Sequence, residues 1–119
     1  MTIQSYNREG LTILRINGRF DVHIVKEIAS WLDQVVKTSP QPQILINLQE
    51  VHFIDSAALA VLVGGFKQAQ KKEGQFCVCD LQQPVRIILE ITGLDKAFPI
   101  FENEDIAIET MEQFKVVPA

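Results

Sequence analysis

Five residues have side-chain types that suit acid–base and nucleophilic chemistry: Asp21 and His23 in one segment, and His52, Asp55 and Ser56 in another. Serine, histidine and aspartate form a catalytic triad only when the fold brings their side chains together, so closeness in sequence is weak support for one. We expect His23 in the first turn of a solvated helix and His52 in a loop. The sequence also lacks a glycine-rich phosphate loop and a Gly-x-Ser-x-Gly elbow. It therefore favours a binding protein over an enzyme.

Ser56 stands between an expected loop and a long apolar helix, where serine commonly acts as the N-cap. A capping role alone would account for it. The position also suits phosphorylation, because the free N–H groups and the dipole of a helix N-terminus stabilise anions. A phosphate would add about −1.5 to −2 charges beside Asp55. It would repel a partner that buries this surface while the fold stays intact.

The helix expected from Ser56 to about Lys72 is apolar nearly all round in its first half. A core-facing stripe comprises Leu59, Leu62, Val63, Phe66 and Ala69. A second set of small or apolar residues, Ala57, Ala58, Ala60, Val61 and Gly64, falls largely outside that stripe. This second set is either covered by another layer or exposed for a partner. Two glycines inside a helix, Gly64 and Gly65, suggest that another backbone comes close.

The elements that position these residues alternate between strands and helices. The expected strands are Ile3–Arg8, Leu11–Asn17, Ile44–Leu48, Gln75–Asp80 and Phe98–Phe101. The expected helices follow the N-cap Asp21, start at Ser56, run from Pro84 to Gly93, and follow the cap Asn103 with a stripe of Ile106, Ile108, Met111 and Phe114. The tail Lys115–Ala119 should be loose. The order β-β-α-β-α-β-α-β-α predicts a single α/β domain over residues 1–119, with a mixed sheet.

Composition excludes several classes of function. The net charge of −4, without a long basic run, argues against nucleic-acid binding. The longest apolar stretch, Ala57–Phe66, is too short by about half to span a bilayer. The first residues do not resemble a signal peptide, so we expect a cytoplasmic protein without a membrane partner. Cys77 and Cys79 should be reduced thiols near the core, and we expect neither metal nor cofactor.

Several segments resemble one family. Phe53-Ile54-Asp55-Ser56-Ala57-Ala58-Leu59 is similar to the Asp-Ser-Ser-Gly-Leu signature of STAS domains, the sulfate-transporter and anti-sigma-factor-antagonist domains. The segments Gly18–Asp21, Ile46–Leu48, Pro84–Leu94 and Phe98–Ala107 resemble further landmarks of the family, in the family's order. The resemblance covers nearly the whole chain. It implies the STAS fold, a mixed β-sheet packed with about four helices.

The free-standing bacterial anti-sigma factor antagonists resemble this chain most closely. The resemblance implies that the unmodified protein binds an anti-sigma factor that is also a GHKL-type serine kinase. Phosphorylation of Ser56 would release that partner, and a PP2C-type serine phosphatase would reset the protein. By position, Ser56 would be the phosphoacceptor, and the partner-facing surface would comprise Asp21, His23, Asp55, Ser56, Ala57, Ala58 and Val61.

The sequence departs from the signature at Ala57, which replaces a second serine, and at Ala58, which replaces the glycine. The first change leaves Ser56 as the sole acceptor there, and the second alters the fit to a partner. Two other functions stay open. One is an unswitched STAS scaffold or accessory subunit of a signalling or transport complex, and the other is a nucleotide-binding module that relies on the helix N-terminus at Ser56. The absence of a coiled coil favours a monomer.

Overall fold

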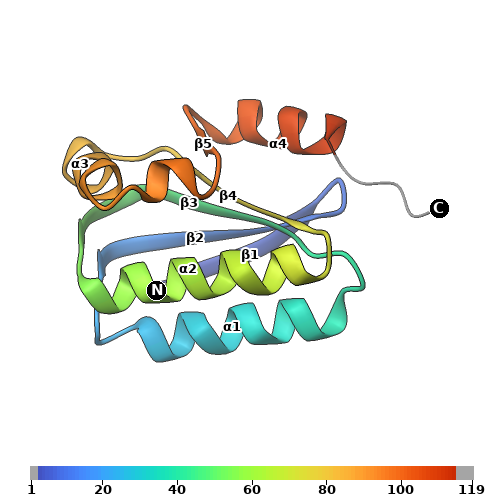
Figure 1. Cartoon of the computed structure of the whole chain (residues 1–119), viewed down its shortest axis with the longest axis horizontal. Helices are drawn as coiled ribbons and strands as arrows, with labels where there is room; N and C mark the ends of the chain where they lie inside the picture. The colour runs from blue at the N-terminus through green and yellow to red at the C-terminus, as the bar shows by residue number, and fades with distance from the viewer. Residues whose placement is uncertain (1–2, 115–119) are drawn as a thin grey trace.

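The computed structural model describes residues 3–114 and forms a five-stranded sheet in the order β1-β2-β3-β4-β5 (Figure 1). The strands are β1 Ile3–Arg8, β2 Leu11–Phe20, β3 Gln43–Ile54, β4 Gln75–Cys79 and β5 Ile100–Phe101. β1 runs antiparallel to β2, and every other neighbouring pair is parallel. The tight turn between β1 and β2 uses Glu9 and Gly10, both at positive φ, as a two-residue hairpin requires. The expected mixed sheet is confirmed.

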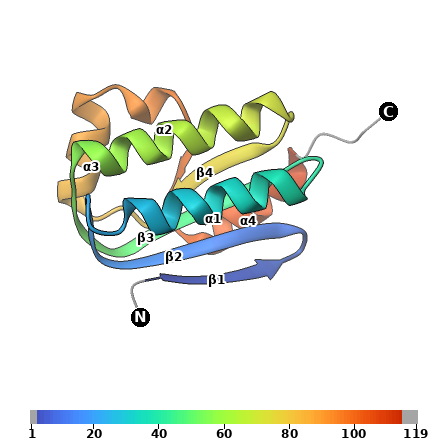
Figure 2. The ribbon, with the colours of Figure 1, turned by 90° about the horizontal axis from the view of Figure 1, so that it is seen from below.

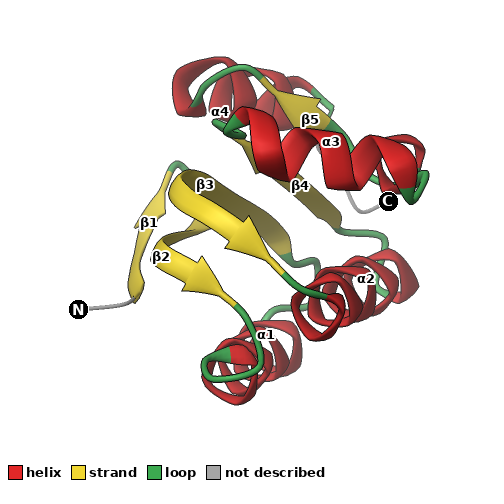
Figure 3. Ribbon diagram, turned by 90° about the vertical axis from the view of Figure 1, so that its left-hand side faces the viewer, coloured by secondary structure: helices red, strands yellow, loops and turns green. Residues whose placement is uncertain are grey.

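The helices are α1 Val25–Thr38, α2 Ser56–Lys71, α3 Gln83–Ile91 and α4 Glu104–Gln113, with a short 3-10 turn η1 at Leu94–Lys96. The order of elements is the predicted β-β-α-β-α-β-α-β-α. α1 and α2 lie side by side on one face of the sheet, and α4 covers part of the opposite face (Figure 3). α3 packs near the carboxyl end of β3 (Figure 1).

The first half of β3, residues 43–48, is buried on both faces, as its continuous apolar run predicts. Ile44, Ile46 and Leu48 join the core beneath α1 and α2, whereas Leu45 joins a second core beneath α4. Cys77 and Cys79 lie in this second core as free thiols. Burial raises the pKa of both, that of Cys77 to about 12, so neither is a reactive thiolate near neutral pH.

Several boundaries differ from the sequence prediction. α1 begins at Val25, so the prediction of Asp21 as its N-cap is wrong, and His23 lies in the turn before the helix rather than in its first turn. β3 continues to Ile54, which places His52 in a strand instead of a loop. Within α4 the buried residues are Ala107, Ile108 and Met111, whereas Ile106 and Phe114 are exposed. The predicted stripe failed because Ile106 and Ile108 are two apart, which is not a helical spacing. The loose tail Lys115–Ala119 lies outside the described residues.

The two adjacent glycines of α2 have different surroundings. A Cβ on Gly65 would lie 2.7 Å from Phe76 Cε2 and 3.0 Å from Leu32 Cδ1, whereas a Cβ on Gly64 would meet nothing within 4 Å. Core side chains, not another backbone, therefore approach the helix, and only at Gly65.

We expect alanine at these glycines to change stability in opposite directions. Gly64→Ala should raise the free energy of unfolding by about 0.5–1 kcal/mol, because alanine favours a helix interior and open space receives its methyl group. Gly65→Ala should lower it, because overpacking costs about 1–3 kcal/mol and exceeds that gain. Urea unfolding of both variants measures the difference. Equal stabilisation by the two substitutions would contradict the packing described for Gly65.

Glu104, in the first turn of α4, joins that helix to the sheet. Its carboxylate accepts hydrogen bonds from Arg15 at 3.0 and 2.9 Å, and further hydrogen bonds from Tyr6 and Asn47. Burial raises the pKa of Glu104, but the hydrogen bonds from Arg15, Tyr6 and Asn47 outweigh it, so the pKa lies below the usual value. The folded pKa is depressed, so the resulting stabilisation is present above the unfolded pKa and is lost as the pH falls through the folded one.

Tyr6 is the only tyrosine of the chain, so an absorbance titration of phenolate formation reports on it alone. Burial, followed by the hydrogen bond to Glu104, raises its pKa from 10.0 to about 12. We expect Glu104→Ala to move the midpoint part of the way towards 10.0, because burial persists while the acceptor and its charge are lost. An unchanged midpoint in Glu104→Ala would show that the hydrogen bond does not form.

Candidate functional site

The parallel strands β2 and β3 end side by side, and this brings the two segments with candidate residues together. Phe20 is paired with Ile54, and Asp55 N donates to Phe20 O at 3.4 Å. The turn that precedes α1 and the first turn of α2 therefore meet at one edge of the sheet, where both helices begin (Figure 2). Parallel strands commonly place functional loops at this carboxyl edge. Residues 19–24 and 53–57 together form this edge, the switch edge.

Asp55 joins the two halves of the switch edge. Its Oδ1 accepts from Ala58 N at 2.9 Å, and its Oδ2 accepts from Val22 N at 3.0 Å. Asp55 has extended backbone angles and is the N-cap of α2. The prediction that Ser56 is the cap is therefore wrong, since Ser56 is the first residue of the helix itself.

Ser56 is exposed at this helix start. Within residues 3–114, no hydrogen bond involves its hydroxyl. The first N–H groups of a helix have no acceptor within the helix, so the hydroxyl stands beside unsatisfied donors. Ser56 therefore does not cap α2, and its side chain is accessible to another protein.

Asp21 organises the neighbouring turn. Its Oδ1 accepts from His23 N at 3.0 Å and lies 3.2 Å from His23 Nδ1, and its Oδ2 accepts from Arg19 Nε at 3.1 Å. These hydrogen bonds, led by the one from the backbone of His23, lower the pKa of Asp21 and keep it ionised. The guanidinium of Arg19 also lies 3.8 Å from the ring centroid of Phe53 on the adjacent strand. Arg19 is thereby held between an anion and an aromatic ring.

The structure exposes only some of the predicted partner-facing residues. His23 and Ser56 are exposed, and Asp55, Ala57 and Val61 are partly exposed. Ala58 is 0% exposed and belongs to the core, so its place on the predicted surface is wrong. The buried stripe of α2 comprises Ala58, Leu62, Gly65 and Ala69. This stripe is rotated about the helix axis relative to the predicted one, so the side chain of Ala58 faces the core.

Asp21 is also mostly buried, at 6% exposure. It stabilises the turn through its hydrogen bonds and adds little to the surface that a partner could contact. Sequence reasoning missed Val22, which is 62% exposed in the middle of that turn. The available signal was an apolar residue between Asp21 and His23 at the predicted start of the helix. The side chain of Val22 adds an exposed apolar group to the switch edge, and the backbone N–H of Val22 donates a hydrogen bond to Asp55.

A shallow groove of about 270 Å³ runs between α1 and α2 below the switch edge. It is lined by Ala29 and Leu32 of α1 and by Ala60, Val61 and Gly64 of α2, among others. Three residues that the sequence places outside the core stripe, Ala60, Val61 and Gly64, thus line this groove. Of the other two, Ala57 is partly exposed and Ala58 is buried. The partly exposed Val61 belongs to this groove.

Residues 3–114 contain no cluster of histidine, cysteine and acidic side chains with the arrangement of a metal site. No helix in the same range is long and apolar enough to cross a bilayer.

Comparisons with known proteins agree with these observations. A family model described as STAS domain matches residues 2–107. The anti-sigma F factor antagonist of Paenibacillus polymyxa is 30% identical over 112 residues, which cover 94% of this chain and 96% of that protein. Among solved structures, an anti-sigma-factor antagonist (STAS) domain protein from Planctomyces limnophilus has a TM-score of 0.86 at 23% identity, over 92% of this chain and 97% of the other. The Bacillus cell fate determinant SpoIIAA in its phosphorylated form has a TM-score of 0.74 at 18% identity, over 91% and 97%.

Proposed function

The chain belongs to the STAS domain family, and we propose that it acts as an anti-sigma factor antagonist whose binding is switched off by phosphorylation of Ser56. Anti-sigma factor antagonists of this family are binding proteins and not enzymes, in agreement with the sequence analysis. The partner is an anti-sigma factor, as the names of the relatives suggest.

The observation that carries the proposal is the position of Ser56. Its exposed hydroxyl lies at the first residue of α2, and Asp55 rather than Ser56 caps the helix. A modification of Ser56 therefore leaves the cap hydrogen bond in place. The helix N-terminus tolerates a phosphate, while the added negative charge next to Asp55 opposes a partner seated on the switch edge.

The proposed partner is a serine kinase of the GHKL type that is itself the anti-sigma factor. It binds the unmodified switch edge and the groove between α1 and α2, using the surface formed by Val22, His23, Ser56, Ala57 and Val61. A PP2C-type serine phosphatase restores the unmodified state. The whole cycle takes place in the cytoplasm, with this protein as a single STAS domain and a monomer when alone. A phosphorylated form is known for the structural neighbour SpoIIAA, which supports the switch.

The phosphorylation experiment uses the serine kinases of the source organism with ATP, and intact mass with peptide mapping as the readout. We expect one phosphoryl group on the wild type, mapped to Ser56, and none on Ser56→Ala. Exposed Ser30 provides an internal comparison, because its peptide should stay unmodified. Modification elsewhere, or none with any kinase, would favour the unswitched scaffold.

A further inference from the structure

Irregular pairing between β2 and β3 changes which side chains face away from α1 and α2. Arg15 is paired with Asn47 but Asn17 with Glu50, and a second shift separates Gly18 from Arg19. Two such bulges in β3 explain why Leu48, Val51 and Ile54, spaced three apart, all join the core beneath the helices. In a regular strand, residues three apart point to opposite faces, so Val51 would face away from the core that Leu48 and Ile54 join. The bulges instead put Gln49 and Glu50 next to each other on the opposite, outer face.

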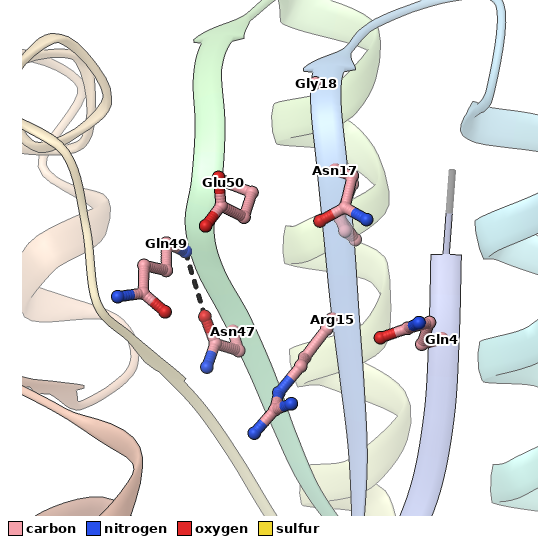
Figure 4. Close-up of a pocket in the computed structure, with 8 residues that line it drawn as sticks. Gln4, Arg15, Asn17, Gly18, Asn47, Gln49 and Glu50 are labelled. Carbon is pink, nitrogen blue, oxygen red and sulfur yellow. Dashed lines mark hydrogen bonds between the residues drawn. The ribbon is translucent and has the colours of Figure 1, made fainter. Parts of the chain in front are cut away.

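This outer face contains an open trough of about 670 Å³ (Figure 4). Its polar lining comprises Gln4 of β1, Arg15 and Asn17 of β2, and Asn47, Gln49 and Glu50 of β3. The size is within the range of small-molecule sites, which bury most of a bound ligand. Because hydrogen-bonding side chains from three strands converge there, a polar ligand fits better than an apolar one.

The base of the trough is held in place by hydrogen bonds. Arg15 and Asn47 both donate to Glu104, and Asn47 Oδ1 accepts from Gln49 N at 2.9 Å (Figure 4). The Asn47 side chain is buried, with 5% exposure for the residue. Fixed donors and acceptors of this kind lower the entropic cost of ligand binding.

The charges in the trough are unequally matched. The guanidinium of Arg15 is paired with the carboxylate of Glu104 at 2.9 Å. Glu50, in contrast, has no ion pair within residues 3–114 and is exposed. The trough therefore has one uncompensated negative charge beside several carboxamides. A carboxamide both donates and accepts hydrogen bonds, as a hydroxyl group does.

We propose that this trough is a binding site for a small, multiply hydroxylated amine, with its ammonium group on Glu50 and its hydroxyl groups on the carboxamides of Gln4 and Gln49. The site lies on the outer face of the sheet, and the proposal does not depend on the function proposed for Ser56. An anion is disfavoured because the only guanidinium of the trough is already neutralised by Glu104.

The test is a ¹⁵N-resolved NMR titration of the full chain with two probes of the same ring, glucosamine and glucose, at a pH where the amine is protonated. We expect glucosamine to shift the side-chain amide signals of Gln4 and Gln49 with a dissociation constant of about 1 mM or lower, and glucose to bind at least about tenfold more weakly. Absence of shifts with glucosamine, or equal affinity for both probes, overturns the proposal.

Two variants separate the role of Glu50 from a general effect of charge. Glu50→Gln keeps the shape of an exposed side chain and should weaken glucosamine binding at least about tenfold. Glu90→Gln removes the same charge from the exposed surface of α3 and should leave the affinity unchanged. Unaltered binding by Glu50→Gln, or equal losses in both variants, would assign the effect to net charge and overturn the site. Binding of acetate in place of glucosamine would likewise overturn it.

Discussion

Ser56→Asp should weaken the complex with the anti-sigma factor kinase by about a hundredfold or more, which is about 2.7 kcal/mol. The substitution adds a charge next to Asp55 at the exposed start of α2. A partner seated on the switch edge would then bury two adjacent carboxylates, and like charges together with their desolvation oppose binding. Calorimetric titration of the kinase identified by the phosphorylation experiment measures the loss.

Two controls separate this effect from damage to the fold. Ser5→Asp makes the same chemical change at an exposed position on the edge strand β1 and should leave the affinity unaltered. Ser56→Ala should bind as the wild type does and keep its stability within about 0.5 kcal/mol, because Ser56 is not the helix cap. Full affinity of Ser56→Asp would reject the electrostatic switch.

Asp55→Ala should lower the free energy of unfolding by about 2.5–5 kcal/mol. The carboxylate accepts from Ala58 N and from Val22 N, so its removal takes away a helix cap worth about 1–2 kcal/mol and a second charge-assisted hydrogen bond worth about 1.5–3 kcal/mol. The turn with Val22 would also lose its anchor on α2, and we expect the affinity for the kinase to fall with it. Urea unfolding measures the stability change.

Asn103→Ala is the matched comparison for this cap. Asn103 caps α4 through one hydrogen bond, to Ile106 N at 2.9 Å, and its loss should cost about 1 kcal/mol. Asp55→Asn should be intermediate, because an amide oxygen still accepts one N–H while the amide nitrogen cannot accept the other. If Asp55→Ala costs no more than Asn103→Ala, the second hydrogen bond adds nothing to stability.

The sequence predicted the order and type of every strand and α-helix within residues 3–114, because turn residues and apolar periods mark them clearly. It could not choose the cap of α2, since Asp55 and Ser56 are adjacent and both residue types cap helices well. The choice follows from Val22 N–H, which comes from a turn 33 residues earlier. Asp21 was misread for a related reason, because its carboxylate binds its own turn and the helix begins only at Val25.

The surface of α2 was only partly predictable. A helix that is apolar nearly all round gives no signal for which side faces the sheet, so Ala58 was placed outside and Leu59 inside, although only Ala58 is fully buried. The full length of β3 was missed because its bulges break the two-residue alternation after Leu48. The same bulges form the outer trough, which no sequence pattern indicated.

The measurement that tests the central claim most directly compares the affinity of one kinase partner for two forms of this protein, unmodified and phosphorylated on Ser56. Both affinities are determined by calorimetric titration under the same conditions. The unmodified form should bind, and the phosphorylated form should bind at least about a hundredfold more weakly while its thermal unfolding midpoint stays the same. Equal affinities of the two forms would contradict the switch and leave the STAS fold as a scaffold without it.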